Sequence, residues 1–229
     1  KKDGLFSRED FFKKIGADPS KKLILYAFSG KSGLNIEFSV LETLHRAVKS
    51  REIKEGVQIL LRPYPRYDFP ETRLRELKDR YGFMVFSPVA HAGGGKGDWE
   101  FDAEALDFLS NSLAQADLVI TMYSTFFIEA AIFDKPLVGV AFDGDKSLDY
   151  WNSARRFFDW NHLAEIKPSG GIRLVKSKEE FISAINRYLA EPGYLAEGRA
   201  RLVRQQCQFT DGLSGERLGK TIIKVLGLN

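Results

Sequence analysis

Apolar residues gather in six short runs along the chain, and each run is about as long as a β-strand. The runs are nearly continuous rather than alternating, which is typical of strands buried on both faces of a sheet. They lie at residues 23–28, 57–61, 83–86, 118–121, 137–142 and 172–175.

The segments between these runs carry apolar residues at helical spacing, three or four residues apart. The clearest sets are Phe38, Leu41, Leu44 and Val48, then Leu106, Leu109 and Leu113, and finally Phe181, Ile185 and Tyr188. Strands that alternate with helices of this length predict an α/β fold with a Rossmann-like, doubly wound parallel sheet.

The two ends of the chain differ from this alternating region. Residues 1–20 are polar apart from one short amphipathic helix at 8–15, which Gly16 and Pro19 end. We therefore expect a lead-in segment or linker at 1–20 and one domain at 21–229. Residues 178–227 are mostly helical, with breaks at 191–193 and 210–212.

Composition narrows the class of protein. The chain has 229 residues, 44% of them apolar and 28% charged, and a net charge of +3 with mixed signs. This mild excess suits an anionic ligand and gives no reason to expect nucleic acid as a partner. The single cysteine, Cys207, excludes an internal disulfide and favours a reducing compartment, so we expect a cytoplasmic protein. The first residue is lysine, which suggests a piece of a longer protein.

Ligands of such sheets bind beyond the carboxyl ends of the strands. The segments to consider are therefore residues 29–33, 62–66, 87–99, 122–125 and 142–146, which are richer in Gly, Ser, Arg and Lys than the strands before them.

One of these segments opens a short apolar helix with two hydroxyls, Ser124 and Thr125, and carries one acid, Glu129, a turn further on. The hydroxyls could simply cap the helix. Alternatively, the open amides and partial positive charge of a helix start could bind a phosphate. Glu129 would then be placed to accept hydrogen bonds from two ribose hydroxyls. Its apolar flanks, such as Ile128 and Ile132, predict a carboxylate that needs a partner.

The stretch "STFFIEAAIFDKP" (124–136) resembles the nucleotide-binding motif of GT-B glycosyltransferases and related enzymes. The wider context agrees, in "LILYAFSG" (23–30), "LLRPYPR" (60–66) and "TDGLSGER" (210–217). Over residues 20–225 the chain is similar to the CDP-glycerol glycerophosphotransferase-like group of bacterial surface-polymer enzymes. The non-hydrolysing UDP-N-acetylglucosamine 2-epimerases are more distant relatives.

This resemblance implies a donor-binding half of a GT-B enzyme, without its N-terminal acceptor domain. Ser124 and Thr125 would hold the diphosphate of CDP-glycerol or of a nucleotide sugar, and Glu129 the ribose. No metal or other cofactor would be needed. The acceptor would be a surface polymer or a lipid-linked molecule, with the enzyme in the cytoplasm or at the inner face of the membrane. Many relatives have His-Pro where this chain has Arg62-Pro63, so the catalytic residues stay unassigned.

Two further candidates follow the first two strands. Ser29, Gly30 and Lys31 could cradle a phosphate through their backbone amides, or form an ordinary strand–helix turn. Arg62 could form a forked contact with a phosphate, or simply pack between Pro63 and Pro65.

Other patterns do not indicate a cofactor. The glycine-rich segment 91–99 lacks the frame of a dinucleotide fingerprint, and is either a loop lining a base pocket or a plain solvent loop. Asp143 and Asp145 form an Asp-x-Asp pair that binds metal in other folds, but here Asp145 more simply caps a helix. The histidines are scattered, and with one cysteine there is no zinc spacing.

Three alternatives stay open from the sequence. A 2-epimerase would use the same donor pocket but needs additional acids and a histidine. A non-catalytic nucleotide-sugar-binding module would bind without transferring. A response-regulator-like domain would require acids after the first strand, where Ser29, Gly30 and Lys31 stand instead.

Overall fold

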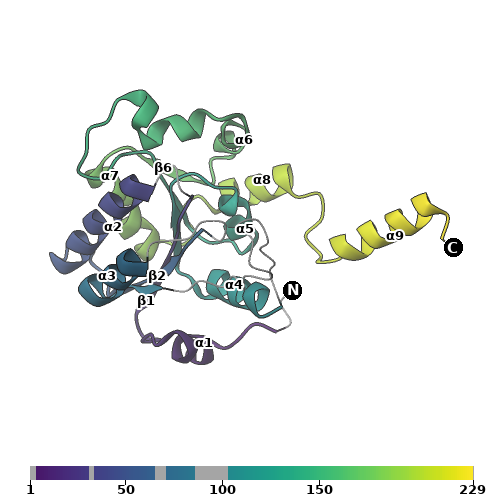
Figure 1. Ribbon diagram of the computed structural model, residues 1–229, viewed down its shortest axis with the longest axis horizontal. Coiled ribbons are helices and arrows are strands. Elements are labelled where there is room, and N and C mark those ends of the chain that lie inside the picture. Colours follow the sequence, from purple (N-terminus) through teal and green to yellow (C-terminus); the bar gives the residue numbers. More distant parts are fainter. Residues whose placement is uncertain (1–3, 31–33, 65–70, 86–102, 229) are drawn as a thin grey trace.

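The computed structural model describes residues 4–30, 34–64, 71–85 and 103–228. Its centre is a sheet of six parallel strands in the order β3-β2-β1-β4-β5-β6 (Figure 1). The strands are β1 (Lys22–Ala27), β2 (Val57–Arg62), β3 (Met84–Val85), β4 (Leu118–Thr121), β5 (Leu137–Val140) and β6 (Arg173–Val175). The predicted α/β fold and all six predicted strand positions are confirmed, with ends that differ by a few residues.

Helices cover both faces of the sheet (Figure 1). One face carries α2 (Leu34–Lys49), α3 (Glu71–Tyr81) and α7 (Lys178–Ala190), and the other carries α4 (Ala103–Gln115), α5 (Phe126–Ile132) and α8 (Ala196–Gln206). Between β5 and β6 lie the short helices η2 (Tyr150–Asn152), η3 (Ala154–Asp159), α6 (Asn161–Ala164) and η4 (Lys167–Ser169). The winding direction reverses between β1 and β4, which is where sheets of this order open a ligand crevice.

The core explains why the central strands have continuous apolar sequences. Residues 23–27 of β1 and all four residues of β4 are buried, because helices cover the sheet above and below them.

The helix in the predicted lead-in segment, α1 (Arg8–Ile15), shares this core. Phe11 and Phe12 are fully buried, and the Phe11 ring lies 5.5 Å from that of Phe108 in α4. Arg8 forms an ion pair of 3.1 Å with Asp117, just before β4. Residues 8–15 therefore pack against α4 as part of the common core, and the boundary at residue 20 stays a prediction.

The C-terminal helices behave differently from each other. α8 packs closely enough that a Cβ on Gly198 would lie 2.3 Å from the backbone of Gly170. In contrast, α9 (Ser214–Leu226) has no buried residue and extends away from the rest of the molecule (Figure 1). No helix in the described part of the chain has the length and apolar character needed to cross a bilayer.

Candidate functional site

The connection from β4 to α5 holds the two hydroxyls predicted to bind a phosphate. The Ser124 hydroxyl accepts a hydrogen bond of 3.1 Å from the amide of Phe126, whereas the exposed Thr125 side chain makes no capping bond. The amides of Phe127 and Ile128 donate to the carbonyls of Ser124 and Thr125. The expectation of open amides at this helix start is therefore wrong, because the first three amides of α5 already have acceptors. A phosphate here would meet hydroxyls instead.

Glu129 lies one turn into α5, and its side chain is exposed to solvent. The apolar flanks of Glu129 do not enclose its carboxylate, because α5 buries a different face, with Phe126, Phe127, Ala130 and Ala131. Partial desolvation raises the pKa of Glu129, and the nearby charge of Arg62 opposes that shift. Within the described residues Glu129 forms no ion pair shorter than 4 Å, so its oxygens remain available to a ligand.

Arg62 ends β2 and reaches the same place. Its guanidinium carbon lies 5.0 Å from the centre of the Phe126 ring, at the first residue of α5. Burial lowers the pKa of Arg62, while the carboxylate of Glu129 raises it. The Arg62 Nε atom is buried and has no hydrogen-bond partner among the described residues. The structure thus brings a cation from β2 beside the hydroxyls and the acid of α5.

Ser29 and Gly30 lie at the end of β1, next to this group, but face inward. The Ser29 amide donates to Glu37 over 2.9 Å, and the Ser29 hydroxyl accepts from the amide of Tyr123 over 3.0 Å. Gly30 has a φ of +117°, which favours glycine, and a Cβ there would lie 3.6 Å from the Tyr64 ring. These contacts fasten the end of β1 to the end of β4. Lys31 and the segment 87–99 lie outside the described residues.

Glu37 is a buried acid that was not predicted from the sequence. It is fully buried in the first turn of α2, and burial raises its pKa to about 8. One carboxyl oxygen accepts from Ser29, while the other has no partner among the described residues. Its spacing to Leu41 and Leu44 places it on the core face of α2, and that spacing was the available signal.

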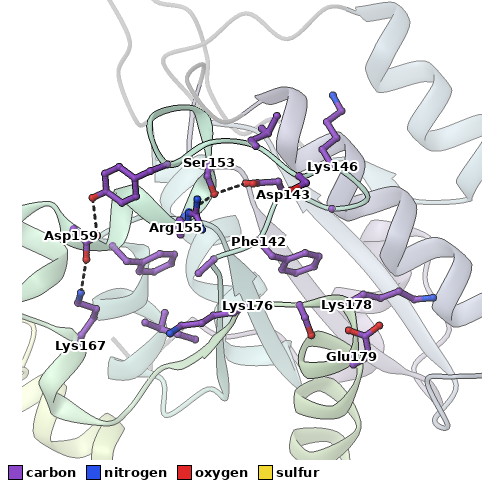
Figure 2. Close-up of a pocket in the computed structure, with 18 residues that line it drawn as sticks. Phe142, Asp143, Lys146, Ser153, Arg155, Asp159, Lys167, Lys176, Lys178 and Glu179 are labelled. Carbon is purple, nitrogen blue, oxygen red and sulfur yellow. Dashed lines mark hydrogen bonds and ion pairs between the residues drawn. The ribbon is translucent and has the colours of Figure 1, made fainter.

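A second feature of the carboxyl edge is an open cleft of about 750 Å³ beyond β5 and β6, here called the basic cleft (Figure 2). It lies between the loop after β5, helix η3 and the start of α7. Lys146 comes from one wall, and Lys176 and Lys178 from the opposite wall (Figure 2). The segments that the sequence predicts to contact a ligand end at residue 146, so they do not include the end of the last strand.

Asp143 of the Asp-x-Asp pair lines this cleft, and both acids of the pair already have partners in the chain. Asp143 accepts hydrogen bonds from the Ser153 hydroxyl and the Ala154 amide, at 3.0 and 2.7 Å, and Asp145 pairs with Arg46. No group of three His, Cys, Asp or Glu residues suited to a metal occurs among the described residues. The helix cap is Asp149 rather than the expected Asp145, since the Asp149 side chain accepts hydrogen bonds from the amides of Trp151 and Asn152 in η2.

The chain belongs to the family described as CDP-glycerol:poly(glycerophosphate) glycerophosphotransferase, whose sequence profile matches residues 7–224. This confirms the resemblance stated above and places the chain in a family of transferases. No curated protein sequence matches the chain.

Solved structures with this fold include the wall teichoic acid polymerase TagF with CDPG. It is 16% identical with a TM-score of 0.57, and the match covers 96% of this chain and 46% of TagF. The S. aureus MnaA–UDP complex is 14% identical with a TM-score of 0.55, covering 99% of this chain and 51% of MnaA. The chain thus spans about half the length of these two proteins.

A separately solved domain is also similar. It is the C-terminal CMP-Kdo binding domain of WaaA from Acinetobacter baumannii, 11% identical with a TM-score of 0.51. Here the match covers 88% of this chain and 96% of the other. At these identities, all three similarities establish the fold alone.

Proposed function

We propose that this chain binds a nucleotide-activated donor, CDP-glycerol or a nucleotide sugar, as the donor half of a transferase acting on a bacterial surface polymer or a lipid-linked acceptor. Family membership supports the reaction class. The observation that carries the proposal is that Arg62, Ser124, Thr125 and Glu129 come from two strand ends to one place beside the β1/β4 switch point.

The chemistry of this group suits a nucleotide. The Arg62 guanidinium and the two hydroxyls would donate hydrogen bonds to the diphosphate, and the exposed carboxylate of Glu129 would accept from the ribose hydroxyls. In the transfer from CDP-glycerol, an acceptor hydroxyl attacks the phosphorus that bears glycerol, and CMP departs. Arg62 would stabilise the negative charge that develops on CMP. Ser29 and Glu37 would contribute by fixing the end of β1 against β4.

The remaining parts of the enzyme would come from elsewhere. We propose that an N-terminal acceptor domain supplies the base that takes the proton of the acceptor hydroxyl, and that it covers the apolar side of α9. We further propose a cytoplasmic enzyme that works at the inner face of the membrane. A 2-epimerase would instead invert the configuration at one carbon of a UDP-sugar. A binding module would show no transfer to any acceptor, even in the whole protein.

Calorimetric titration of the 229-residue chain with CDP, UDP, GDP and CMP tests the proposal. We expect one of these nucleotides to bind in the micromolar to millimolar range. Arg62→Gln should weaken binding of the diphosphate by about tenfold or more, because a charged hydrogen bond contributes about 1.5–3 kcal/mol. Arg204→Gln, on the exposed side of α8, is the matched control and should bind like the wild type. Absence of binding to all four nucleotides, or equal affinity in the two variants, would contradict the proposal.

A further inference from the structure

The carboxyl edge of the sheet divides into two neighbouring parts. The proposed donor residues follow β1, β2 and β4, which are adjacent in the sheet. The basic cleft follows β5 and β6, the next two strands in the same order. None of the proposed donor residues lines the basic cleft. A molecule in the cleft would therefore lie beside the donor without competing for the same side chains.

The side chains that line the basic cleft carry an excess of positive charge. Five are basic and three are acidic, a net charge of +2. Two of the three acids are occupied by donors in the chain, while Glu179, at the start of α7, is exposed. Asp143 accepts from Ser153 and Ala154, and Asp159 pairs with Lys167 over 3.3 Å and accepts from the Tyr150 hydroxyl (Figure 2).

Part of the basic charge is not held in an ion pair, although Lys176 lies near enough to Asp159 to help lower the pKa of that acid. Lys178 pairs with Glu52 at 3.6 Å, and the Arg155 guanidinium lies 6.0 Å from the Tyr150 ring. Within the described residues the side chains of Lys146 and Lys176 form neither a hydrogen bond nor an ion pair. These two lysines come from opposite sides of the cleft, and the side chain of Lys146 points outward at its rim (Figure 2). An extended anion that crosses the cleft and passes over this rim could contact both.

We propose that the basic cleft binds phosphodiester groups of a polyanionic acceptor chain of the glycerol phosphate class, next to the donor site. The choice of this acceptor rests on the proposed function and on the poly(glycerophosphate) in the family's description. The volume, about 750 Å³, lies in the range of sites that enclose drug-sized ligands. A single phosphate would fill only part of it, whereas consecutive phosphodiesters match charges on both walls.

The test compares binding of a short synthetic glycerol phosphate oligomer to the wild-type chain and to two double variants. Lys146→Gln with Lys176→Gln removes the two lysines of the cleft that form no ion pair among the described residues. Lys13→Gln with Lys49→Gln removes two exposed lysines on α1 and α2, away from the carboxyl edge, and serves as the matched control. Equal unfolding midpoints would show that all three proteins fold alike. Binding of a glycerol phosphate monomer and of CDP is measured in parallel.

We expect the cleft variant to bind the oligomer at least about tenfold more weakly than the wild type and the control, while CDP affinity stays unchanged. The monomer should bind more weakly than the oligomer. No oligomer binding by the wild type, equal loss in both variants, or a monomer as tight as the oligomer would overturn the proposal. A parallel loss of CDP would assign the cleft to the donor instead. If CDP does not bind at all but oligomer binding depends on Lys146 and Lys176, the donor proposal fails and the cleft proposal stands.

Discussion

Two acids, Glu37 and Glu129, show how position on a helix decides what a side chain can do. Both lie early in a helix that follows a central strand. Glu37 falls on the face that packs onto the sheet and is fully buried, so its neutral form is favoured. Glu129 falls on the outer face of α5, where it stays exposed beside Arg62. The first suits positioning of a strand end, and the second suits contact with a ligand.

The raised pKa of Glu37 predicts a specific dependence of stability on pH. In the unfolded chain the carboxyl group ionises near 4.5, whereas in the folded chain it does so near 8. Between these values the folded state holds a proton that the unfolded state has lost, so stability falls as pH rises through this window. The slope from this one group is at most about 1.4 kcal/mol per pH unit.

Glu37→Gln removes this slope because glutamine does not titrate. Urea unfolding of the wild type and the variant at several values between pH 5 and pH 8.5 measures it. The wild type should lose stability relative to the variant as pH rises. Glu9→Gln, exposed on α1, should follow the wild type. Parallel curves for the wild type and Glu37→Gln would contradict the assignment of a buried, protonated acid.

At the scale of elements, the sequence predicted the strands better than the site. Six apolar runs identify six strands because both faces of this sheet are covered. Helical spacing also located α2, α4 and α7, and the residues at 191–193 and 210–212 indicated the breaks on either side of α8. The side of α5 that carries Glu129 was not predicted, because α5 is mostly apolar and has no clear polar face. The hydrogen bonds that its first amides donate depend on local backbone geometry, which residue type alone does not specify.

The packing of α8 gives a prediction at this scale. Gly198 has no room for a side chain, since a Cβ would lie 2.3 Å from both the carbonyl carbon and the oxygen of Gly170. We expect Gly198→Ala to lower the free energy of unfolding by about 1–3 kcal/mol through overpacking. Gly219→Ala, in the open middle of α9, has free space around it and should not lower stability. Urea unfolding compares the two variants. Equal midpoints would show that the close backbone contact between α8 and Gly170 does not contribute to stability.

The whole molecule combines a closed core with one unpartnered element. α9 exposes apolar side chains at helical spacing, with Leu218 at 62%, Ile222 at 48% and Val225 at 78% exposure. The neighbouring α8 is anchored by the buried Arg199, whose guanidinium bonds Asp134 and two backbone carbonyls. The structure therefore separates a packed α/β body from a helix that buries no residue against it.

This separation predicts that α9 tolerates polar substitution in the isolated chain. Leu218→Gln with Ile222→Gln should leave the urea midpoint unchanged, because neither side chain is buried. Leu202→Gln, on the packed side of α8, should lower it by several kcal/mol, as expected for a polar group in the core. A matching loss in the α9 variant would mean that α9 packs on the body of the chain.

The most direct measurement of the central claim is a double-mutant cycle between Glu129 and the ribose. Calorimetry would compare CDP with dideoxy-CDP, which lacks both ribose hydroxyls, on the wild type and on Glu129→Ala. If another nucleotide of the panel binds best, that nucleotide and its dideoxy form are compared instead. We predict that the wild type discriminates between the two by about tenfold or more, and that Glu129→Ala binds both equally weakly. The same discrimination in both proteins would show that Glu129 does not hold the ribose.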